Sequence, residues 1–336
     1  MLTAPAVKSD TPIMLDTLRK FRDESFATPP PEAAFAEADA RPTRIFVGIP
    51  TTGRPTILPD TVRALAKQTR LPDALILSIA SLDDLGDLAP EHLPFEVEII
   101  IGKKGAAGQR NRMLTLLDKR DVLLLLDDDF LMEPDYIENT LKLFRQEDDV
   151  VVATGTVLAD GIIGPGYDHE EGARRLEALS QAPRSDAVNP IYAGYGCNMA
   201  FRVETALAND IRFDENLPLY SWLEDVDFSR RLAAHGRVVR AGALRGVHLG
   251  TKTGRTPGIF LGYSQIANPV YLVRKGTMTR RHACELVLRS MASNTLRAFK
   301  RAGVNDYRGR LRGNLVAVKD VLRGRDSPGR ITELRP

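Results

Sequence analysis

Three adjacent carboxylates, Asp127 to Asp129, are the residues of this sequence best suited to chemistry. They directly follow an apolar run at 122–126, which predicts a buried strand. Adjacent carboxylates repel one another unless a cation or hydrogen-bond donors offset their charge. Mg²⁺ and Mn²⁺ take oxygen ligands, commonly one or two carboxylates together with substrate phosphates. The run therefore predicts a metal and phosphate site, and an acidic cap on the following helix is the alternative.

A second acidic group, Glu224 and Asp225, begins a stretch with apolar residues at Val226 and Leu232. That pattern predicts an amphipathic helix starting near the two carboxylates. A carboxylate there could deprotonate an acceptor hydroxyl, which is the work of a general base. The alternative is a negatively charged first helical turn paired with the arginines that follow. Taken alone, this segment favours the alternative.

The elements that must position these carboxylates begin at residue 44. Short apolar runs predict strands at 45–49, 75–79, 97–101, 122–126 and 150–154, and helical patterns lie at 58–69, 108–118 and 134–146. A further, loop-rich segment at 160–190 contains a polar helix near 170–181. This alternation predicts an α/β fold with a mostly parallel sheet covered by helices. Because open parallel sheets bind ligands beyond the carboxyl ends of their strands, the aspartate run stands where a ligand is expected.

Composition narrows the class of protein. The 336 residues are 43% hydrophobic and 27% charged, which is typical of a globular protein. The two cysteines are far apart and outside any CxxC pair, so neither a paired-cysteine zinc site nor a disulfide framework is expected. The expected location is the reducing cytoplasm. No basic leader with an apolar segment and no apolar run of membrane-spanning length is present, so we expect neither an export signal nor a spanning helix.

Charge is distributed unevenly along the chain. From residue 271 to the end there are 16 Lys and Arg residues against 5 Asp and Glu, whereas the whole chain carries a net charge of only +2. This basic region reads as helical from 264 to about 324. Such helices either bind anionic lipid surfaces or pack on the domain with their charged face in solvent. The sequence therefore allows attachment to the inner face of the cell membrane but does not decide it. Nucleic acid is not an expected partner because no base-reading motif accompanies the charge.

The order of the short motifs is more specific than any one of them. After the first strand come Pro50 and Thr51, then a glycine-containing loop with Arg110 and Asn111, then the aspartate run, a segment beginning at Gly194, Phe213-Asp214-Glu215, and finally Glu224-Asp225. This succession resembles the family 2 inverting glycosyltransferases of the GT-A fold, of the bacterial polysaccharide and glycolipid assembly type. The resemblance covers about residues 44–250 and, more loosely, the basic helices.

The resemblance implies a fold, a domain division and a donor site. A mostly parallel, Rossmann-like nucleotide-binding sheet flanked by helices would occupy 44–263, after an extension at 1–43 with a short helix near 12–24 and before a basic helical region at 264–336. Asp127 and Asp129 match the DxD motif and would hold Mn²⁺ or Mg²⁺ with His248. The residues implied to contact the nucleotide sugar are Pro50, Thr51, Thr52, Arg110, Asn111, Asp127 and Asp128. Of the aspartate run, Asp128 is expected to tolerate change best.

A physical argument accompanies the implied donor site. Backbone amides at the start of the helix near residue 108, together with Arg110, suit a diphosphate. The family often ends its second strand with an aspartate that reads the base. Here Asp83 and Asp84 stand later in the chain, so one of them is displaced into that role or the base is read otherwise.

The resemblance also assigns the acceptor side. Asp225 matches the catalytic base and Glu224 a neighbour that positions the acceptor or the base, whereas Asp227 is expected to be structural. Gly196 and Trp222 are implied to line the acceptor site. A tryptophan ring can cover the apolar face of a sugar, but a core position for Trp222 is equally open.

The function implied is metal-dependent transfer of a sugar, with inversion, from a nucleotide-diphosphate sugar to a glycan or lipid-linked acceptor. A retaining transferase, a sugar nucleotidyltransferase and a membrane-surface scaffold with a degenerate domain are the alternatives. A dinucleotide dehydrogenase is not expected because no GxGxxG follows the first strand.

Overall fold

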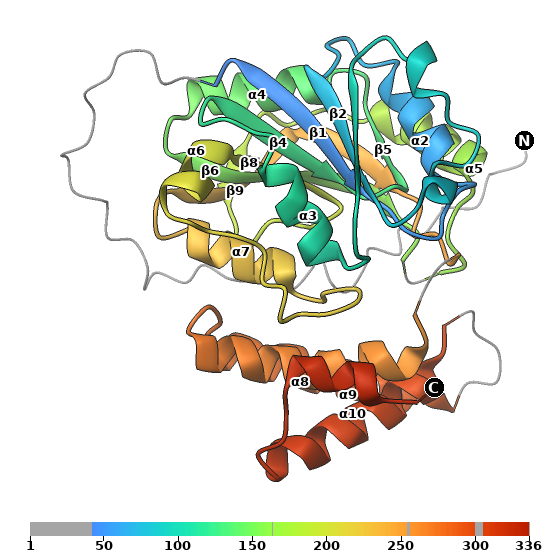
Figure 1. The fold of residues 1–336 in the computed structure, drawn as a ribbon, viewed down its shortest axis with the longest axis vertical. Helices are drawn as coiled ribbons and strands as arrows, with labels where there is room; N and C mark the ends of the chain where they lie inside the picture. The colour runs from blue at the N-terminus through green and yellow to red at the C-terminus, as the bar shows by residue number, and fades with distance from the viewer. Residues whose placement is uncertain (1–41, 163, 254–255, 300–304, 336) are drawn as a thin grey trace, which may run out of the picture.

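The computed structural model describes residues 42–162, 164–253, 256–299 and 305–335. The helix expected near 12–24 lies outside these residues. A nine-stranded sheet forms the centre of the first part of the chain, in the order β3-β2-β1-β4-β8-β6-β9-β5 with β7 beside β9 (Figure 1). Its strands are β1 Arg44–Pro50, β2 Ala74–Ile79, β3 Val97–Ile101, β4 Asp121–Leu126, β5 Phe130–Met132, β6 Val150–Asp160, β7 Val188–Pro190, β8 Asn198–Arg202 and β9 Arg237–His248.

The sheet is parallel through its first four strands and then mixed. β3, β2, β1 and β4 run parallel to their neighbours, and so does β6 with β9. β8 is antiparallel to β4 and to β6, and the short strands β5 and β7 are antiparallel to β9. The α/β class and the strands at 45–49, 75–79, 97–101, 122–126 and 150–154 are thus confirmed, and the last of these extends to Asp160.

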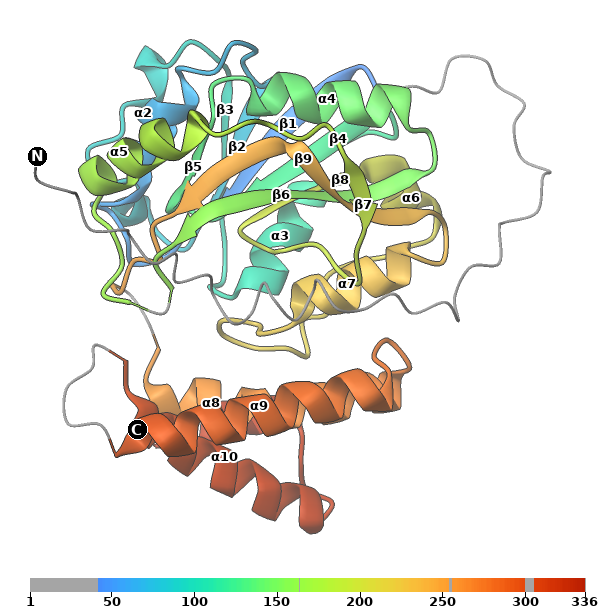
Figure 2. The same ribbon diagram turned by 180° about the vertical axis from the view of Figure 1, so that it is seen from behind.

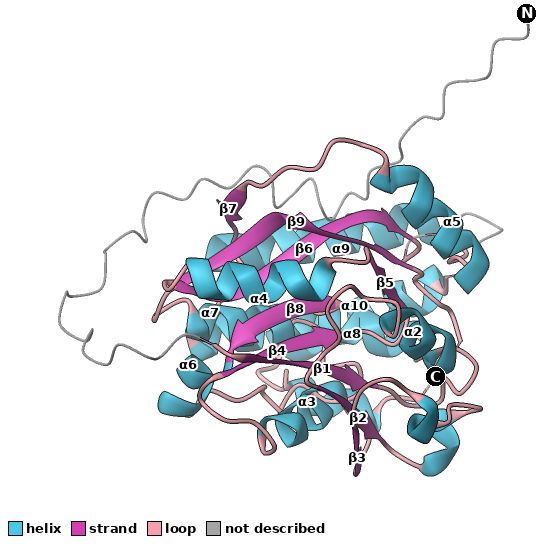
Figure 3. Ribbon diagram, turned by 90° about the horizontal axis from the view of Figure 1, so that it is seen from above, coloured by secondary structure: helices cyan, strands magenta, loops and turns pink. Residues whose placement is uncertain are grey.

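Helices cover both faces of the sheet because alternate residues of its inner strands point to opposite sides (Figure 3). Leu124 packs with α2 Leu58–Leu65 and α4 Tyr136–Gln146, whereas Leu123 and Leu125 pack with α3 Ala106–Leu114, α6 Val203–Ala208 and α7 Glu224–Leu232. All six residues of β4 are buried, which is why that strand reads as a continuous apolar run. The structure also contains α5 His169–Ser180 and short 3₁₀ helices η2 Leu82–Leu85, η3 Pro90–His92 and η4 Pro328–Glu333. α3 begins and ends earlier than the helix expected at 108–118.

Three helices form a separate layer below α3 and α7 (Figures 1 and 2). They are α8 Gly258–Lys275, α9 Arg280–Ala298 and α10 Tyr307–Leu322, so the helical region starts before residue 264. α8 and α10 approach so closely that a Cβ on Gly262 would lie 2.0 Å from the carbonyl oxygen of Arg310. The Asn314 side chain donates to the Gly262 carbonyl at 2.6 Å and accepts from Asn294 at 2.8 Å, which joins the three helices. Within the described parts of the chain, no helix is long and apolar enough to cross a bilayer.

Candidate active site

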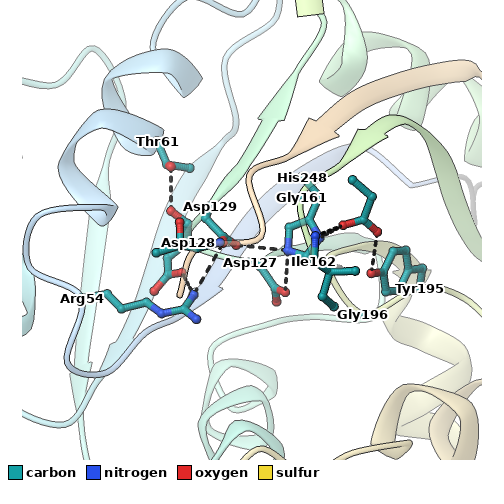
Figure 4. Close-up of polar contacts among 12 residues, drawn as sticks. Arg54, Thr61, Asp127, Asp128, Asp129, Gly161, Ile162, Tyr195, Gly196 and His248 are labelled. Atoms are coloured by element: carbon teal, nitrogen blue, oxygen red, sulfur yellow. Dashed lines mark hydrogen bonds and ion pairs between the residues drawn. The ribbon is translucent and has the colours of Figure 1, made fainter. Parts of the chain in front are cut away.

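Asp127, Asp129 and His248 lie together at one end of the sheet, although 119 residues separate the two buried members in sequence (Figure 4). The strand registers explain this. Asp127 and Asp129 follow β4, and β5 pairs with β9 so that Phe130 faces His248. The Nε2 atom of His248 lies 3.3 Å from Oδ1 of Asp129 and 3.8 Å from Oδ2 of Asp127. One ligand atom from each of the three side chains lies within 4.8 Å of the others, which is a geometry that could hold a metal ion.

The contacts around this group fit a divalent cation. Oδ1 of Asp129 is buried and accepts no hydrogen bond, whereas its Oδ2 accepts the Thr251 N–H at 2.8 Å. An orphaned buried carboxylate oxygen facing an imidazole nitrogen is the arrangement that an oxygen- and nitrogen-binding ion would complete. Burial alone would raise the pKa of Asp129, but His248, Arg54 and the Thr251 N–H together outweigh it and the pKa is lowered. Asp129 is therefore ionised at neutral pH, as a ligand must be.

Asp160 holds the His248 ring from its other side. The register between β6 and β9 places Asp160 opposite His248, and the Nδ1 atom of His248 lies 3.0 Å from Oδ1 of Asp160. The second oxygen of Asp160 accepts the Tyr195 hydroxyl at 3.1 Å. A carboxylate on Nδ1 leaves Nε2 as the nitrogen that faces Asp129. Asp160 is not among the residues expected from the sequence, because nothing in the order of motifs places residue 160 beside residue 248.

Asp128 points away from Asp127 and Asp129, toward Arg54 and Thr51 (Figure 4). Arg54 donates to Oδ1 of Asp128 at 2.6 Å and lies 3.8 Å from Asp129, and Thr51 donates to Oδ2 of Asp128 at 2.5 Å. The Thr61 hydroxyl donates to the backbone carbonyl of Asp128 at 2.6 Å. These contacts fix the turn that carries the candidate metal ligands Asp127 and Asp129. Because Asp128 makes these contacts, we no longer expect it to tolerate change best. Arg54 is a residue of the candidate site that was not expected from the sequence.

Asp225 and Glu224 begin α7 beside Arg110. Arg110 forms an ion pair with Glu224, lies 3.5 Å from Oδ1 of Asp127 and donates to the carbonyl of Gly196 at 3.1 Å. The Gly196 N–H donates to Oδ2 of Asp225 at 2.9 Å. Arg110 and Gly196 thus connect the second acidic group to the aspartate run. Burial raises the pKa of Asp225, and the charge of Arg110 opposes only part of that rise.

Gly196 has little room for a side chain at this point. A Cβ would lie 3.2 Å from Oδ2 of Asp225 and 3.3 Å from Nη2 of Arg110. The pairing of β4 with β8 positions the Gly196 backbone. One further hydrogen bond extends that pairing, from the Asp127 N–H to the carbonyl of Cys197 at 3.1 Å. Gly196 therefore contacts the expected base directly, and its expected place on the acceptor side stays a prediction.

The first amides of α3 have hydrogen-bond acceptors within the protein. The Ala106 N–H donates to the carbonyl of Leu219 and the Ala107 N–H to the hydroxyl of Ser221, both at 3.3 Å. The Gly105 N–H donates to the Gln109 side chain at 3.2 Å. A loop from before α7 thus covers these amides and Glu224 pairs with Arg110. The expected contact of Arg110 with the donor diphosphate stays a prediction.

Other expected site residues have contacts of their own. The Asn111 amide donates to the Phe213 carbonyl at 2.9 Å and accepts the Phe213 N–H at 2.8 Å, so it fastens α3 to the loop at 211–217. Thr51 is buried, and half-buried Pro50 and Thr52 flank it at the end of β1. Half-buried Trp222 packs on an apolar cluster with Leu272, and its carbonyl accepts from Asn268 at 2.7 Å.

Asp84 and Asp227 serve the framework. The Asp84 carboxylate accepts the N–H groups of Gly53, Ala80 and Ser81 at 2.7 to 3.1 Å, so it joins the loops after β1 and β2. Asp83 is exposed. Asp227 is fully buried and accepts from Nζ of Lys275 and from the Thr277 hydroxyl, each at 2.7 Å. Lys275 also donates to Asp214 at 2.6 Å. This network ties α7, which carries the expected base, to the end of α8.

The segment before α7 has an unusual backbone. Leu219, Ser221 and Leu223 have φ angles of 60°, 53° and 75°, in the left-handed region. Residues that carry a Cβ, unlike glycine, adopt that region only at an energetic cost. Leu223 is the N-terminal cap residue of α7 and directly precedes Glu224. The direction in which α7 presents its two carboxylates therefore depends on this segment.

Residues 46–205 match the family model Glycos_transf_2, described as glycosyl transferase family 2. This chain contains a family 2 glycosyltransferase domain. The matched range includes Arg110, Asp127 and Asp129, whereas Asp225 and His248 lie beyond it. The α/β sheet with its flanking helices is the GT-A fold, which binds nucleotide sugars, and glycosyltransferase activity is the activity of the family. The family match favours sugar transfer over the sugar nucleotidyltransferase alternative.

Solved structures share the fold of this family 2 domain at low sequence identity. The mannosyltransferase PcManGT from Pyrobaculum calidifontis, in complex with GDP-Man and Mn²⁺, is 12% identical, with a TM-score of 0.51 over 84% of this chain and 87% of that one. S. aureus TarS 1-349 in complex with UDP-GlcNAc is 13% identical, with a TM-score of 0.48 over 77% of this chain and 74% of that one. No curated protein matches the chain.

Proposed function

We propose that this family 2 glycosyltransferase is metal-dependent and inverting, and that it transfers a sugar from a nucleotide-diphosphate sugar to an acceptor hydroxyl. The observation that carries the proposal is the position of Arg110. Its guanidinium contacts Asp127 of the candidate metal group, and also Glu224 and the carbonyl of Gly196. The N–H of the same glycine donates to Asp225. A candidate base thus stands next to a candidate site for the leaving diphosphate, as a direct displacement requires.

Asp127, Asp129 and His248 are the residues that would hold the ion, which we propose to be Mn²⁺ or Mg²⁺. A divalent ion bound there supplies positive charge that stabilises a leaving nucleoside diphosphate. Support comes from the orphaned Asp129 oxygen and from PcManGT, whose complex contains Mn²⁺ together with GDP-Man. Asp160 and Tyr195 would keep the His248 ring in place, and Arg54 would hold the turn through Asp128.

Asp225 is proposed to take the proton from the attacking acceptor hydroxyl. Its Oδ2 is fixed by the Gly196 N–H and its Oδ1 by the Val226 N–H at 2.8 Å. The pKa, raised by burial, makes this carboxylate a stronger base than an exposed aspartate. Glu224 is proposed to keep Arg110 in position between base and metal group. Displacement from the face opposite the diphosphate would invert the configuration of the sugar.

Donor and acceptor are proposed by class. The donor is a nucleotide-diphosphate sugar contacted near Pro50, Thr51, Thr52 and Asp127. The acceptor is a glycan or lipid-linked acceptor near Gly196 and Trp222, used in polysaccharide, glycolipid or cell-surface glycan assembly at the inner face of the cell membrane. The domain division stays part of the proposal, with the transferase domain at about 44–263 and a basic helical region after it.

A thermal-shift panel tests the donor and metal parts of the proposal together. The melting temperature is measured with UDP, GDP and dTDP, each with and without Mn²⁺. We expect one nucleoside diphosphate to raise the melting temperature, and only in the presence of Mn²⁺. A rise that is equal without Mn²⁺ would contradict metal dependence. For the stereochemistry, NMR of the first-formed product tells inversion from retention.

A further inference from the structure

The outer faces of α9 and α10 carry exposed apolar side chains among basic ones. Of the ten large apolar residues that are exposed in the described parts of the chain, five lie between 288 and 322. Leu296, Phe299, Leu315 and Leu322 are 73%, 77%, 58% and 82% exposed. Single exposed leucines are ordinary, but a gathering of this kind marks an interaction surface.

These residues form one surface because of helix geometry. Arg308, Arg312, Leu315, Lys319 and Leu322 are spaced by four, three, four and three residues, so they share one face of α10. Leu296 and Phe299 lie one turn apart at the end of α9. Phe299 lines a cavity of about 570 Å³ together with Arg308, Leu311, Leu315 and Lys319, which joins the end of α9 to this face of α10. We name these seven residues (Leu296, Phe299, Arg308, Arg312, Leu315, Lys319, Leu322) the α9–α10 surface.

Charge identifies the kind of partner. Between residues 280 and 325 the sequence has 12 Lys and Arg residues and 3 Asp and Glu residues. All three acids are engaged elsewhere. Glu285 pairs with Arg281, Asp306 caps the start of α10 by accepting the Gly309 N–H, and Asp320 is buried against Tyr263 and Arg330. The α9–α10 surface therefore presents apolar and cationic groups with no carboxylate of its own, which complements an anionic surface.

The mixture of side chains favours a lipid bilayer over a protein. Arg312 and Lys319 flank Leu315 on the same helical face, and Lys319 lies one turn before Leu322. Leucine and phenylalanine can enter the acyl boundary while neighbouring arginines and lysines bind headgroup phosphates. The core of a protein interface, in contrast, is depleted of charge.

We propose that the α9–α10 surface docks the protein on a membrane that contains anionic phospholipid. Leu296, Phe299, Leu315 and Leu322 enter the headgroup region, and Arg308, Arg312 and Lys319 bind its phosphates. The helices α9 and α10 belong to the helical layer below the sheet (Figure 2). Docking therefore involves none of the residues proposed for sugar transfer. It rests on the proposed function only for the membrane location, and a failure of docking would leave the sugar-transfer chemistry untouched.

Vesicle sedimentation of the full chain tests this docking. Two kinds of vesicle are used, one of phosphatidylcholine alone and one of phosphatidylcholine and phosphatidylglycerol in a roughly two-to-one ratio. We expect binding to the anionic vesicles, weakening as salt is raised, and no binding to the neutral ones. Equal binding to both kinds, or binding to neither, would overturn the proposal.

Three variants locate the binding. R308Q/R312Q/K319Q removes the cations of the surface, and F299S/L315S/L322S removes its apolar contacts. Each should weaken binding to anionic vesicles at least about tenfold. The matched control K67Q/K119Q/K142Q removes three exposed cations from the transferase domain and should bind as the wild type does. Equal loss in the control would show a general charge attraction and overturn the assignment of the surface.

Two further measurements keep these results interpretable. Because the altered residues are exposed, circular dichroism and thermal melting should match the wild type. Light scattering after size exclusion measures the oligomeric state. A wild-type dimer that F299S/L315S/L322S converts to a monomer would show that a second copy occupies this surface, and it would replace the lipid proposal.

Discussion

The Nδ1 atom of His248 lies 3.0 Å from Oδ1 of Asp160, and Nε2 of the same ring faces Asp129. This pair explains how a histidine that is far from the aspartate run in sequence acquires one orientation. The two residues face each other across β6 and β9, so the orientation is built into the sheet.

Replacing Asp160 tests that orienting contact. In Asp160→Asn we expect the affinity for Mn²⁺, measured with a nucleoside diphosphate present, to fall about 10- to 100-fold. The amide keeps the shape of the carboxylate but not its charge, so the imidazole becomes a poorer ligand. Free Mn²⁺ is followed by electron paramagnetic resonance. Asp186→Asn, at an exposed position, is the control, and an unchanged affinity in Asp160→Asn would contradict the role.

Replacing Asp225 tests the general base. Asp225→Asn should lower the rate of transfer at least about 100-fold, because the amide cannot accept a proton from the acceptor hydroxyl. The amide can still accept the Gly196 N–H, so binding of donor nucleotide should stay within about twofold of the wild type. Initial rates and equilibrium binding are measured on the same preparation. Turnover near the wild-type rate would remove Asp225 from the mechanism.

Asp128 is expected to matter for stability more than for metal binding. Asp128→Asn weakens the charged contact with Arg54 and should lower the free energy of unfolding by about 2 kcal/mol. Asp127→Asn, at a more exposed side chain, should cost less stability but weaken Mn²⁺ binding. Urea unfolding compares the two variants. The reverse order of stabilities would restore the view that Asp128 is the most tolerant of the three.

Lys275 neutralises two carboxylates that the fold buries or half-buries. In Lys275→Met, Asp227 keeps the Thr277 hydroxyl but loses its cation, and we expect a loss of about 3 kcal/mol in the free energy of unfolding. Arg63 is 48% exposed, and the two aspartates that it pairs with are 47% and 75% exposed, so Arg63→Gln should cost far less. Equal losses in the two variants would show that burial of Asp227 is not the cause. Adding Asp227→Asn to Lys275→Met should recover part of the loss.

The sequence predicts the sheet and the metal group because both depend on local patterns. A continuous apolar run such as 122–126 favours a buried strand. Carboxylates at its end could cap a helix, but they stand where open parallel sheets bind ligands, which favours a metal site. The resemblance added His248, which the structure places beside Asp129. Strand extents were harder, since Asp160 lies at the end of a strand whose last three residues are all half-buried.

The parts that the sequence did not predict depend on contacts between distant segments. Arg54 reaches Asp128 and Asp129 only because β1 and β4 are neighbours. The start of α3 is covered by Leu219 and Ser221, more than a hundred residues later, which no local pattern at residue 106 reveals. Asn111 appears as a helix-start polar residue in sequence, yet its amide is satisfied by the backbone of Phe213.

The left-handed residues Leu219, Ser221 and Leu223 lower the stability of the fold, while they hold the segment that orients Glu224 and Asp225. Each holds its φ angle at a cost of about 1 kcal/mol that glycine would not incur. Glycine at these positions would relieve the backbone and also release the segment that aims Glu224 and Asp225. Screening this chain for higher melting temperature alone should therefore select changes at 219–223 that slow sugar transfer.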